Sequence, residues 1–340
     1  MAIKIALAGN PNCGKTTMFN ALTGANQYVG NWPGVTVEKK EGKLKGKKGK
    51  GEDIIVTDLP GIYSLSPYTL EEVVSRDYVL KENPDVIIDL VDATNIERNL
   101  YLTTQLIETG VPVVIALNMT DLLEKRGIKI DTKRLSMLLD CPIVETSALK
   151  QTGLDALVET AIKVANKKEV DLPREIFSKE MEAAVADVKG VLPDTISEDK
   201  KRWYAVKFLE NDSKVVESMN LSAAAKAAVD KDRKELETKH NDDMESIVTD
   251  ERYKFIQKIE LSQGIHMLRK LVFTGISSNG DVVRGEIQLG VELVQHTQNQ
   301  PLGHIVFTQH RQLVLWTTIK RALKDVTVRW LHPYVVNSSL

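Results

Sequence analysis

The chain has 340 residues, a length that predicts two domains at about 150 residues each. Charged residues make up 27% and apolar residues 42% of it, which allows a packed core and excludes a chain that is disordered throughout. The formal net charge of −2 argues against a general nucleic-acid-binding protein. No apolar run approaches the roughly 20 residues that cross a bilayer, no signal pattern opens the chain, and two distant cysteines suit a reducing compartment. We therefore expect a soluble cytoplasmic protein.

The composition changes along the chain. Residues 1–260 carry a net charge of −6, whereas residues 261–340 carry +4 and hold five of the six histidines. Within the acidic part, the stretch after about residue 169 is rich in Lys, Glu, Asp and Ala. We therefore divide the chain into three segments rather than two, namely 1–168, 169–260 and 261–340.

The first segment alternates strand and helix patterns. Continuous apolar runs at 85–92 and 111–118 are typical of central strands covered on both faces, and apolar residues recur at helical spacing over 96–108. This order predicts an α/β fold with a mostly parallel sheet flanked by helices, in which ligands bind at the carboxyl ends of the strands. The other expected elements are strands at 3–8, 36–44, 53–58 and 142–146, and a helix at 153–165.

A glycine-rich loop follows the first predicted strand. Its sequence, GNPNCGKT over residues 9–16, fits the phosphate-binding pattern G-x-x-x-x-G-K-[ST] between a strand and a helix. Backbone N–H groups of such a loop surround phosphates, and the N-terminus of the following helix adds partial positive charge. Lys15 would neutralise the β- and γ-phosphates, and the Thr16 hydroxyl would ligate Mg²⁺. The predicted nucleotide-binding residues here are Gly9, Asn10, Pro11, Asn12, Cys13, Gly14, Lys15, Thr16 and Thr17.

Two segments fit nucleotide-dependent switches. Asp58 and Gly61 form a D-x-x-G motif after an apolar strand, where the acid can hold Mg²⁺ through water and the Gly61 N–H can sense a γ-phosphate. Thr36 is the candidate for the other switch, because its hydroxyl or carbonyl would complete the Mg²⁺ shell, although taken alone it fits the start of a strand equally well. Gly34 lies in the same segment and joins the predicted nucleotide site. The expected Mg²⁺ ligands are Thr16, Thr36 and Asp58.

A base-recognition motif ends the strand predicted at 111–118. The carboxylate of Asp121, in the sequence Asn118-Met119-Thr120-Asp121, can accept both the ring N–H and the exocyclic amine of guanine. Adenine offers no such donor pair, so the acid would select GTP over ATP. Backbone N–H groups of Ser147, Ala148 and Leu149, after the last predicted strand, can reach the guanine oxygen. Four motifs in order, each at the end of a strand, predict GTP binding.

The motifs also resemble the cytosolic part of the ferrous iron transport protein B (FeoB) family, among the GTPases related to TrmE and Era. The resemblance implies a GTPase domain attached to a membrane Fe²⁺ transporter, at the cytoplasmic face of the inner membrane, with the transporter's membrane domain as its partner. Met119, where most GTPases carry lysine, also fits this family. The stretches that carry the resemblance are 9–16, 29–38, 58–65, 92–102 and 118–121.

The family resemblance has consequences for hydrolysis. Ile62 follows Gly61 where Ras-like enzymes carry the glutamine that orients the attacking water, so we expect slow GTP hydrolysis. In related GTPases an asparagine matching Asn12 coordinates K⁺ beside the phosphates, with switch carbonyls, here Gly30 and Trp32, completing the shell. We therefore expect hydrolysis stimulated by K⁺. The expected catalytic set is Lys15, Thr36, Gly61 and Asn12.

The remaining two segments carry weaker signals. Residues 169–260 are helical by composition, at 178–188, 198–210, 223–239 and 242–259, and resemble the family's spacer, which implies a role in GDP binding; a plain helical bundle is an equal interpretation. Residues 261–340 do not follow the family: their histidines lack zinc-site spacing, and the segment fits a small appendage, a fusion or a frame-shifted end equally well.

Other functions remain open at this stage. A ribosome- or tRNA-associated GTPase like Era would share the motifs, but the acidic balance of residues 1–260 argues against it, and we expect no nucleic-acid partner. A nucleotide-dependent interaction module with negligible hydrolysis is kept open by Ile62. The sequence leaves open whether the chain forms a homo-oligomer.

Overall fold

The structure, a computed structural model, describes residues 2–24, 27–45, 53–66, 68–125, 130–167, 174–219, 221–263, 270–276 and 282–288. From residue 260 onward only the backbone is described. The chain divides into two units, Met1–Ile265 and His266–Leu340, which are described separately.

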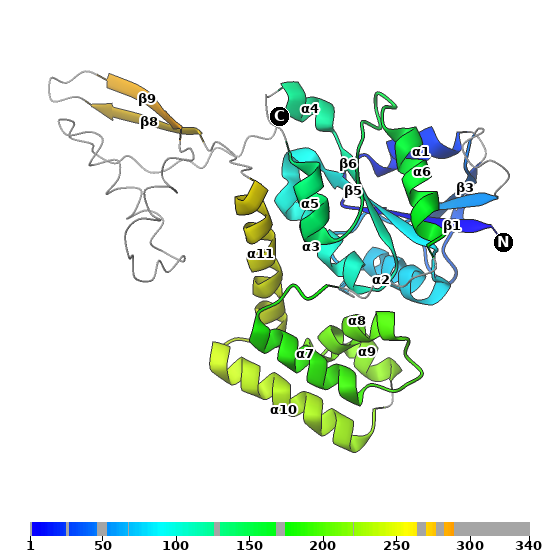
Figure 1. Cartoon of the computed structure of the whole chain (residues 1–340), viewed down its shortest axis with the longest axis vertical. Coiled ribbons are helices and arrows are strands. Elements are labelled where there is room, and N and C mark those ends of the chain that lie inside the picture. The colour runs from blue at the N-terminus through cyan, green and yellow to red at the C-terminus, as the bar shows by residue number, and fades with distance from the viewer. Residues whose placement is uncertain are drawn as a thin grey trace. The chain divides into compact units, whose positions relative to one another are not determined.

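The first unit contains a seven-stranded sheet with the order β2-β3-β4-β1-β5-β6-β7 (Figure 1). All neighbours pair in parallel except at the edge formed by β2 and β3, where the β2–β3 and β3–β4 pairs are antiparallel. The predicted α/β fold is confirmed. The strands are β1 (Ile3–Gly9), β2 (Gln27–Asn31), β3 (Glu38–Lys43), β4 (Ile54–Asp58), β5 (Val86–Asp92), β6 (Val113–Asn118) and β7 (Ile143–Glu145).

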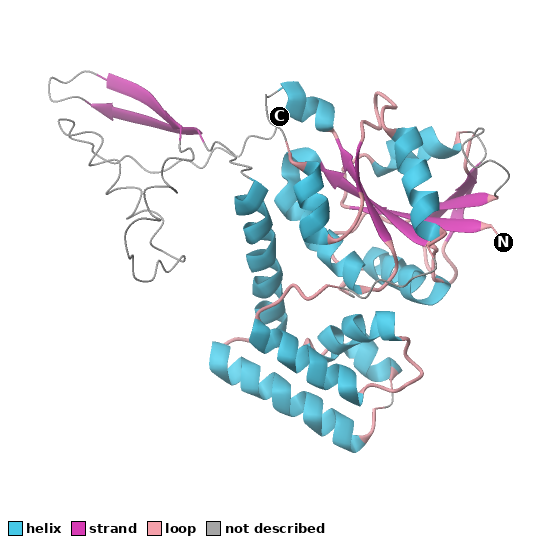
Figure 2. Ribbon diagram, viewed as in Figure 1, coloured by secondary structure: helices cyan, strands magenta, loops and turns pink. Residues whose placement is uncertain are grey.

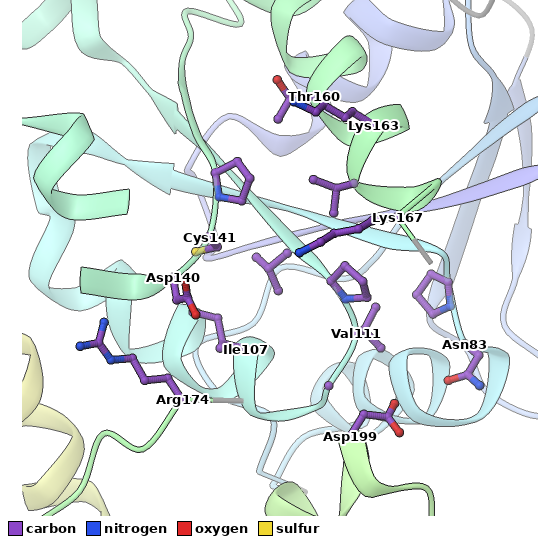
Figure 3. A pocket seen from close by; sticks show the side chains of 16 residues that line it. Asn83, Ile107, Val111, Asp140, Cys141, Thr160, Lys163, Lys167, Arg174 and Asp199 are labelled. Carbon is purple, nitrogen blue, oxygen red and sulfur yellow. The ribbon is translucent and has the colours of Figure 1, made fainter. Parts of the chain in front are cut away.

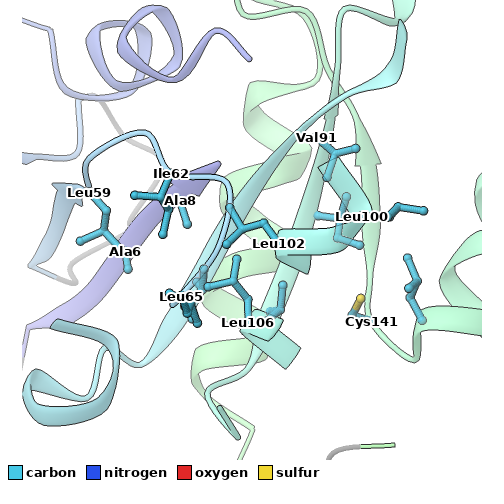
Figure 4. Close-up of a cluster of buried hydrophobic side chains, with 14 of the residues drawn as sticks. Ala6, Ala8, Leu59, Ile62, Leu65, Val91, Leu100, Leu102, Leu106 and Cys141 are labelled. Atoms are coloured by element: carbon cyan, nitrogen blue, oxygen red, sulfur yellow. The ribbon is translucent and has the colours of Figure 1, made fainter. Parts of the chain in front are cut away.

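Helices cover both faces of this sheet, as Figure 2 shows. Successive residues of a strand point to opposite faces, so Ile5 and Ala6 of β1 belong to different buried clusters. The cluster of Ile5 includes residues of α1 (Lys15–Thr23) and α6 (Leu154–Ala165). The cluster of Ala6 includes residues of α2 (Leu70–Asp77), α3 (Ile96–Glu108) and α5 (Thr132–Leu139), and part of it is drawn in Figure 4. Short elements complete this part: a π-helical turn, η1 (Tyr78–Glu82), a 3₁₀ turn, η2 (Ala93–Asn95), and α4 (Thr120–Lys125).

A helical bundle follows the sheet. Its core is built around Trp203 and Val188, both almost fully buried, and the predicted helical segment is confirmed. Serine side chains begin two of its helices: the Ser178 and Ser222 hydroxyls accept from the backbone N–H three residues further on. The helices are α7 (Lys179–Val191), α8 (Glu198–Leu209), α9 (Ser213–Ser218), α10 (Ala223–His240) and α11 (Met244–Gln263).

The last helix of the bundle also packs on the sheet part. Ile256 and Ile259 of α11 are buried in the same cluster as residues of α3 and α5. At the same contact the guanidinium of Arg252 lies 2.6 Å from the Glu108 carboxylate, with both side chains almost fully buried. A second ion pair joins Arg76 of α2 to Asp212, the N-cap of α9, at 3.0 Å. Ion pairs therefore connect the two parts across a contact that also buries apolar side chains.

The second unit is described only at one strand pair. β8 (Lys270–Ile276) and β9 (Val282–Gln288) pair antiparallel, from Lys270 opposite Gln288 to Ile276 opposite Val282. The five histidines after residue 260 lie outside the described residues. No helix in the described part of the chain is long and apolar enough to cross a bilayer.

Candidate nucleotide-binding site

The glycine-rich loop connects β1 to α1 at the carboxyl edge of the sheet. A Cβ on Gly9 would lie 2.7 Å from the Leu90 carbonyl oxygen and 2.8 Å from the Cys13 sulfur, so β5 and the loop leave no room for a side chain. Gly14 has a φ of 93° and Asn12 a φ of 67°, both in the left-handed region. The backbone of the loop is therefore held in a tight curl that favours these small residue types.

Lys15 and Asp58, two residues of the predicted site, are paired in the structure. The Lys15 ammonium lies 2.6 Å from an Asp58 carboxylate oxygen, although the two residues are 43 positions apart. The pairing of β1 with β4 brings them together, since Leu7 lies opposite Asp58 in the register. Burial raises the pKa of Asp58, and the Lys15 charge opposes this rise. A cation and a carboxylate are thus paired at the first residue of α1, the helix that continues with Thr16 and Thr17.

Asn118 connects two loops of the predicted site. Its side-chain amide donates to the Cys13 carbonyl at 2.8 Å, and its side-chain oxygen accepts from the Ala148 N–H at 2.9 Å. The amide nitrogen would also lie 2.6 Å from a Cβ on Gly14, which explains why the loop carries glycine there. This buried side chain therefore fixes the distance between the phosphate loop and residues 147–149.

Asp121 lies next to the loop that Asn118 positions. Its carboxylate is 3.1 Å from the Lys150 ammonium, and the hydrogen bond from Lys150, with a further one from Ser147, lowers the pKa of Asp121. The side chain of Leu149 is 84% exposed and leaves the front of the loop open. Asp121 is thus an ionised acceptor at the edge of the site. Its partner Lys150, which the motif pattern did not indicate, directly follows the predicted Ser147–Leu149 stretch.

The first switch segment is anchored by its tryptophan. Trp32 is buried, its ring meets Tyr78 edge-on at 5.3 Å, and the Lys39 ammonium lies 5.2 Å from the centre of the same ring. The Trp32 carbonyl accepts from the Val35 N–H at 3.2 Å. Gly30 lies within β2 opposite Lys39.

Thr36 and Gly34 belong to the same segment, and among the described residues neither makes a hydrogen bond to the phosphate loop. Gly34 has a φ of 77° and open space where a side chain would be. The structure therefore places this segment beside the site without bringing Thr36 onto Asp58.

The second switch segment lies against the phosphate loop. A Cβ on Gly61 would be 3.3 Å from the Pro11 Cα, and the Ile62 N–H donates to the Gly9 carbonyl at 3.3 Å. The Ile62 side chain is 3% exposed and belongs to the core cluster of Figure 4. Ile62 is thus a core residue that offers no group to an attacking water.

Helix α3 supports this second segment through residues that no motif indicated. The side-chain oxygen of Gln105 accepts from the Leu65 N–H at 2.6 Å, and the Arg98 guanidinium lies 4.1 Å from the centre of the Tyr63 ring. The sequence indicated the helix but not which of its polar residues turn toward the switch.

A large cavity lies elsewhere. It has a volume of about 820 Å³ and lies at the amino ends of β6 and β7, where Val111, Pro112, Cys141 and Pro142 line it together with Lys163 and Arg174 (Figure 3). This edge is opposite the one that holds the phosphate loop, so the cavity is separate from the predicted site.

The phosphate loop, the Lys15–Asp58 pair and Asn118 at the carboxyl edge of this sheet define the fold class of the P-loop GTPases. The chain belongs to the ferrous iron transport protein B family: the family model of that description matches residues 3–161, and the model of the FeoB cytosolic helical domain matches residues 177–261. The predicted resemblance is confirmed.

Curated relatives are longer than this chain. It is 40% identical over 214 residues to the Fe(2+) transporter FeoB of Escherichia coli K12, which covers 62% of the chain and 27% of the relative. It is 41% identical over 267 residues to a Fe(2+) transport protein A/Fe(2+) transporter FeoB fusion protein of Porphyromonas gingivalis, which covers 75% of the chain and 31% of the relative. The chain thus spans less than a third of the length of these relatives.

Solved structures match over both the sheet and the bundle. A point mutant of the S. thermophilus NFeoB bound to mGDP aligns with a TM-score of 0.74 at 48% identity, over 77% of this chain and 100% of that one. The mGMPPNP-bound NFeoB from S. thermophilus aligns with a TM-score of 0.68 at 48% identity, over 78% of this chain and 98% of that one.

Proposed function

We propose that this chain binds GTP and GDP, hydrolyses GTP slowly, and is the nucleotide-responsive part of a larger Fe²⁺ transporter. The observation that carries the proposal is Asn118, which joins the phosphate loop to the loop beside Asp121 by two hydrogen bonds. A phosphate-binding and a base-binding region are thereby held at a fixed separation. The nucleotides named for the S. thermophilus relatives support the same assignment.

The phosphate end of the site fits a magnesium nucleotide. Lys15 and Asp58 supply a cation and a carboxylate 2.6 Å apart, so a bound phosphate would take the ammonium and leave the carboxylate oxygen for the metal. Thr16 and Thr36 are the proposed hydroxyl ligands, as in the sequence prediction. Mg²⁺, when bound, would neutralise charge on the β- and γ-phosphates. Gly61 lies beside Pro11, and its N–H would then detect the γ-phosphate.

Guanine recognition is assigned to Asp121. Like other aspartates the carboxylate is ionised at neutral pH, the lowered pKa keeps it ionised in more acidic solution, and it can accept two hydrogen bonds from guanine. Hydrogen bonds to a charged acceptor are stronger than those between neutral groups, so this acid is suited to discriminate between bases. The Ser147, Ala148 and Leu149 backbone would hold the guanine oxygen.

Calorimetry with GDP, ADP and XDP tests this assignment. We expect GDP to bind and ADP not to bind. The Asp121→Asn variant should bind GDP at least about tenfold more weakly and should bind XDP more tightly, because the 2-oxo group of xanthine accepts a hydrogen bond from the new amide. Glu124→Gln, an exposed acid on the same helix, is the matched control. Equal binding of GDP and ADP would contradict the assignment.

Hydrolysis is proposed to be slow and stimulated by K⁺. The buried Ile62 supplies no group for the attacking water, and Asn12, with the carbonyls of Gly30 and Trp32, is the proposed K⁺ site. GTP turnover is therefore expected to be faster in K⁺ than in Na⁺ buffer, and Asn12→Ala is expected to lose the difference. Equal turnover in both buffers would remove the K⁺ proposal, and no turnover in either would favour an interaction module.

The wider setting is also a proposal. We propose the division 1–168 for the GTPase domain and 169–260 for the helical domain, with 261–340 unassigned, at the cytoplasmic face of the inner membrane. The partner is the membrane domain of the transporter, as the longer relatives suggest. Loss of cellular Fe²⁺ uptake when Lys15→Ala is introduced into the full transporter would support this setting, and undiminished uptake would contradict it.

A further inference from the structure

Arg98 of α3 lies over an aromatic ring of the second switch segment. Its guanidinium carbon is 4.1 Å from the centre of the Tyr63 ring, which is 41% exposed. Such a cation–π contact is an attraction between the cation and the electron-rich face of the ring. Tyr63 is two residues beyond Gly61, whose N–H is the proposed sensor of the γ-phosphate. A contact at Tyr63 therefore acts close to that sensor.

The segment around Tyr63 is held at both ends by backbone hydrogen bonds. On one side the Ile62 N–H donates to the Gly9 carbonyl at 3.3 Å, and on the other the Leu65 N–H donates to the Gln105 side chain at 2.6 Å. Between these points lies Tyr63, and Arg98 packs on its ring.

The turn of α3 that carries Arg98 is itself fixed to the phosphate loop. The buried side chain of Asn10 donates through its amide to the Arg98 carbonyl at 3.3 Å. The Arg98 backbone is therefore held at the phosphate loop, and the Arg98 side chain contacts the second switch segment from that fixed position.

We propose that Arg98 is a positioning residue that holds Tyr63 so that the Gly61 N–H stays at the phosphate loop, ready for a γ-phosphate. This inference rests on the proposed GTP-binding function. GDP has no γ-phosphate and does not use the Gly61 N–H, so loss of the contact weakens GTP binding and leaves GDP binding unchanged. A contact that only stabilised the fold would affect both nucleotides alike.

The test compares a non-hydrolysable GTP analogue with GDP by calorimetry on the full chain. Arg98→Met removes the charge and keeps the length of the side chain, and Tyr63→Leu removes the ring. Each substitution should lower the affinity for the GTP analogue about two- to fivefold, the range expected for an exposed cation–π contact. Both substitutions should leave the affinity for GDP within about 1.5-fold of that of the unaltered chain. The double variant should bind the GTP analogue no more weakly than either single variant.

Two controls complete the design. Tyr63→Phe keeps the ring face and should retain the affinity of the unaltered chain for the analogue, and Arg134→Met removes an exposed arginine on α5. An equal loss of affinity for both nucleotides, additive losses in the double variant, or no loss of affinity at all would overturn the inference. If the unaltered chain bound neither nucleotide, the proposed function would fail instead.

Discussion

The buried ion pair between Glu108 and Arg252 should dominate the stability of the contact between α3 and α11. The two side chains are 2% and 1% exposed, and the charged atoms are 2.6 Å apart. Arg252 also donates to the Thr104 hydroxyl at 3.4 Å. Removing one partner of such a pair leaves the other charge buried, which costs about 3–5 kcal/mol.

Neighbouring charges offer little compensation. In Arg252→Met the cation that remains near Glu108 among the described residues is Arg202, whose Nε is 4.0 Å away, but Arg202 already makes two hydrogen bonds to Glu182, at 2.6 and 2.7 Å. Glu108 would thus stay largely uncompensated. We expect Arg252→Met to lower the free energy of unfolding by about 3–5 kcal/mol, a fall in Tm on the order of 10 °C for a unit of this size.

Urea and thermal unfolding, followed by circular dichroism, measure this loss. The double variant Glu108→Leu/Arg252→Met should recover most of it, because apolar side chains of similar length can replace a buried pair. Glu180→Gln, which breaks an exposed pair with Lys239, is the control and should change stability by less than about 1 kcal/mol. A loss below about 1 kcal/mol in Arg252→Met, or a double variant as unstable as the sum of the singles, would refute the reasoning.

Three further predictions concern Asp89, Gly110 and Cys13. Burial raises the pKa of Asp89 from 3.8 to about 7 against a hydrogen bond from Thr103, so between about pH 4 and 7 the native chain keeps a proton that the unfolded chain releases. The stability gained by Asp89→Asn, measured by urea unfolding, should therefore grow as pH rises from 4 to 7 and then level off; a constant difference would contradict it. Gly110 has a φ of 78°, and a Cβ there would lie 2.4 Å from the Asp199 carbonyl oxygen, so Gly110→Ala should destabilise the chain by more than about 1 kcal/mol in the same assay, and a neutral result would count against this contact. Burial raises the pKa of the Cys13 thiol to about 12, so labelling by a thiol reagent at about pH 8 should be slow until urea unfolds the chain, and rapid labelling of the native chain would disagree.

The sequence predicted the parts of the fold that repeat a strong local pattern. β5 and β6 are continuous apolar runs, and both appear within about two residues of the predicted bounds. The sequence did not predict β2 because it is an edge strand whose residues are half-buried or exposed. This strand is held in the sheet by its pairing with β3. The short helix α9 was missed for a similar reason, since so few turns carry little periodicity.

The residues of the site also fall into those that the sequence could predict and those that it could not. Residues in short motifs, such as Lys15 and Asn118, could be found because the spacing itself implies the chemistry. Arg98 and Arg252 could not, because nothing in a local pattern distinguishes a charge that packs on a ring or in an interface from one in solvent. The contacts that connect the motifs depend on tertiary packing, which places α3 between the switch and α11.

Phosphate release from GTP and from ATP, measured on the full chain in K⁺ buffer with Lys15→Ala as the inactive reference, tests the central claim most directly. We predict slow release from GTP that Lys15→Ala abolishes, and release from ATP no greater than that of the reference. Equal release from both nucleotides, or release from GTP that Lys15→Ala leaves unchanged, would contradict the assignment of this site to GTP.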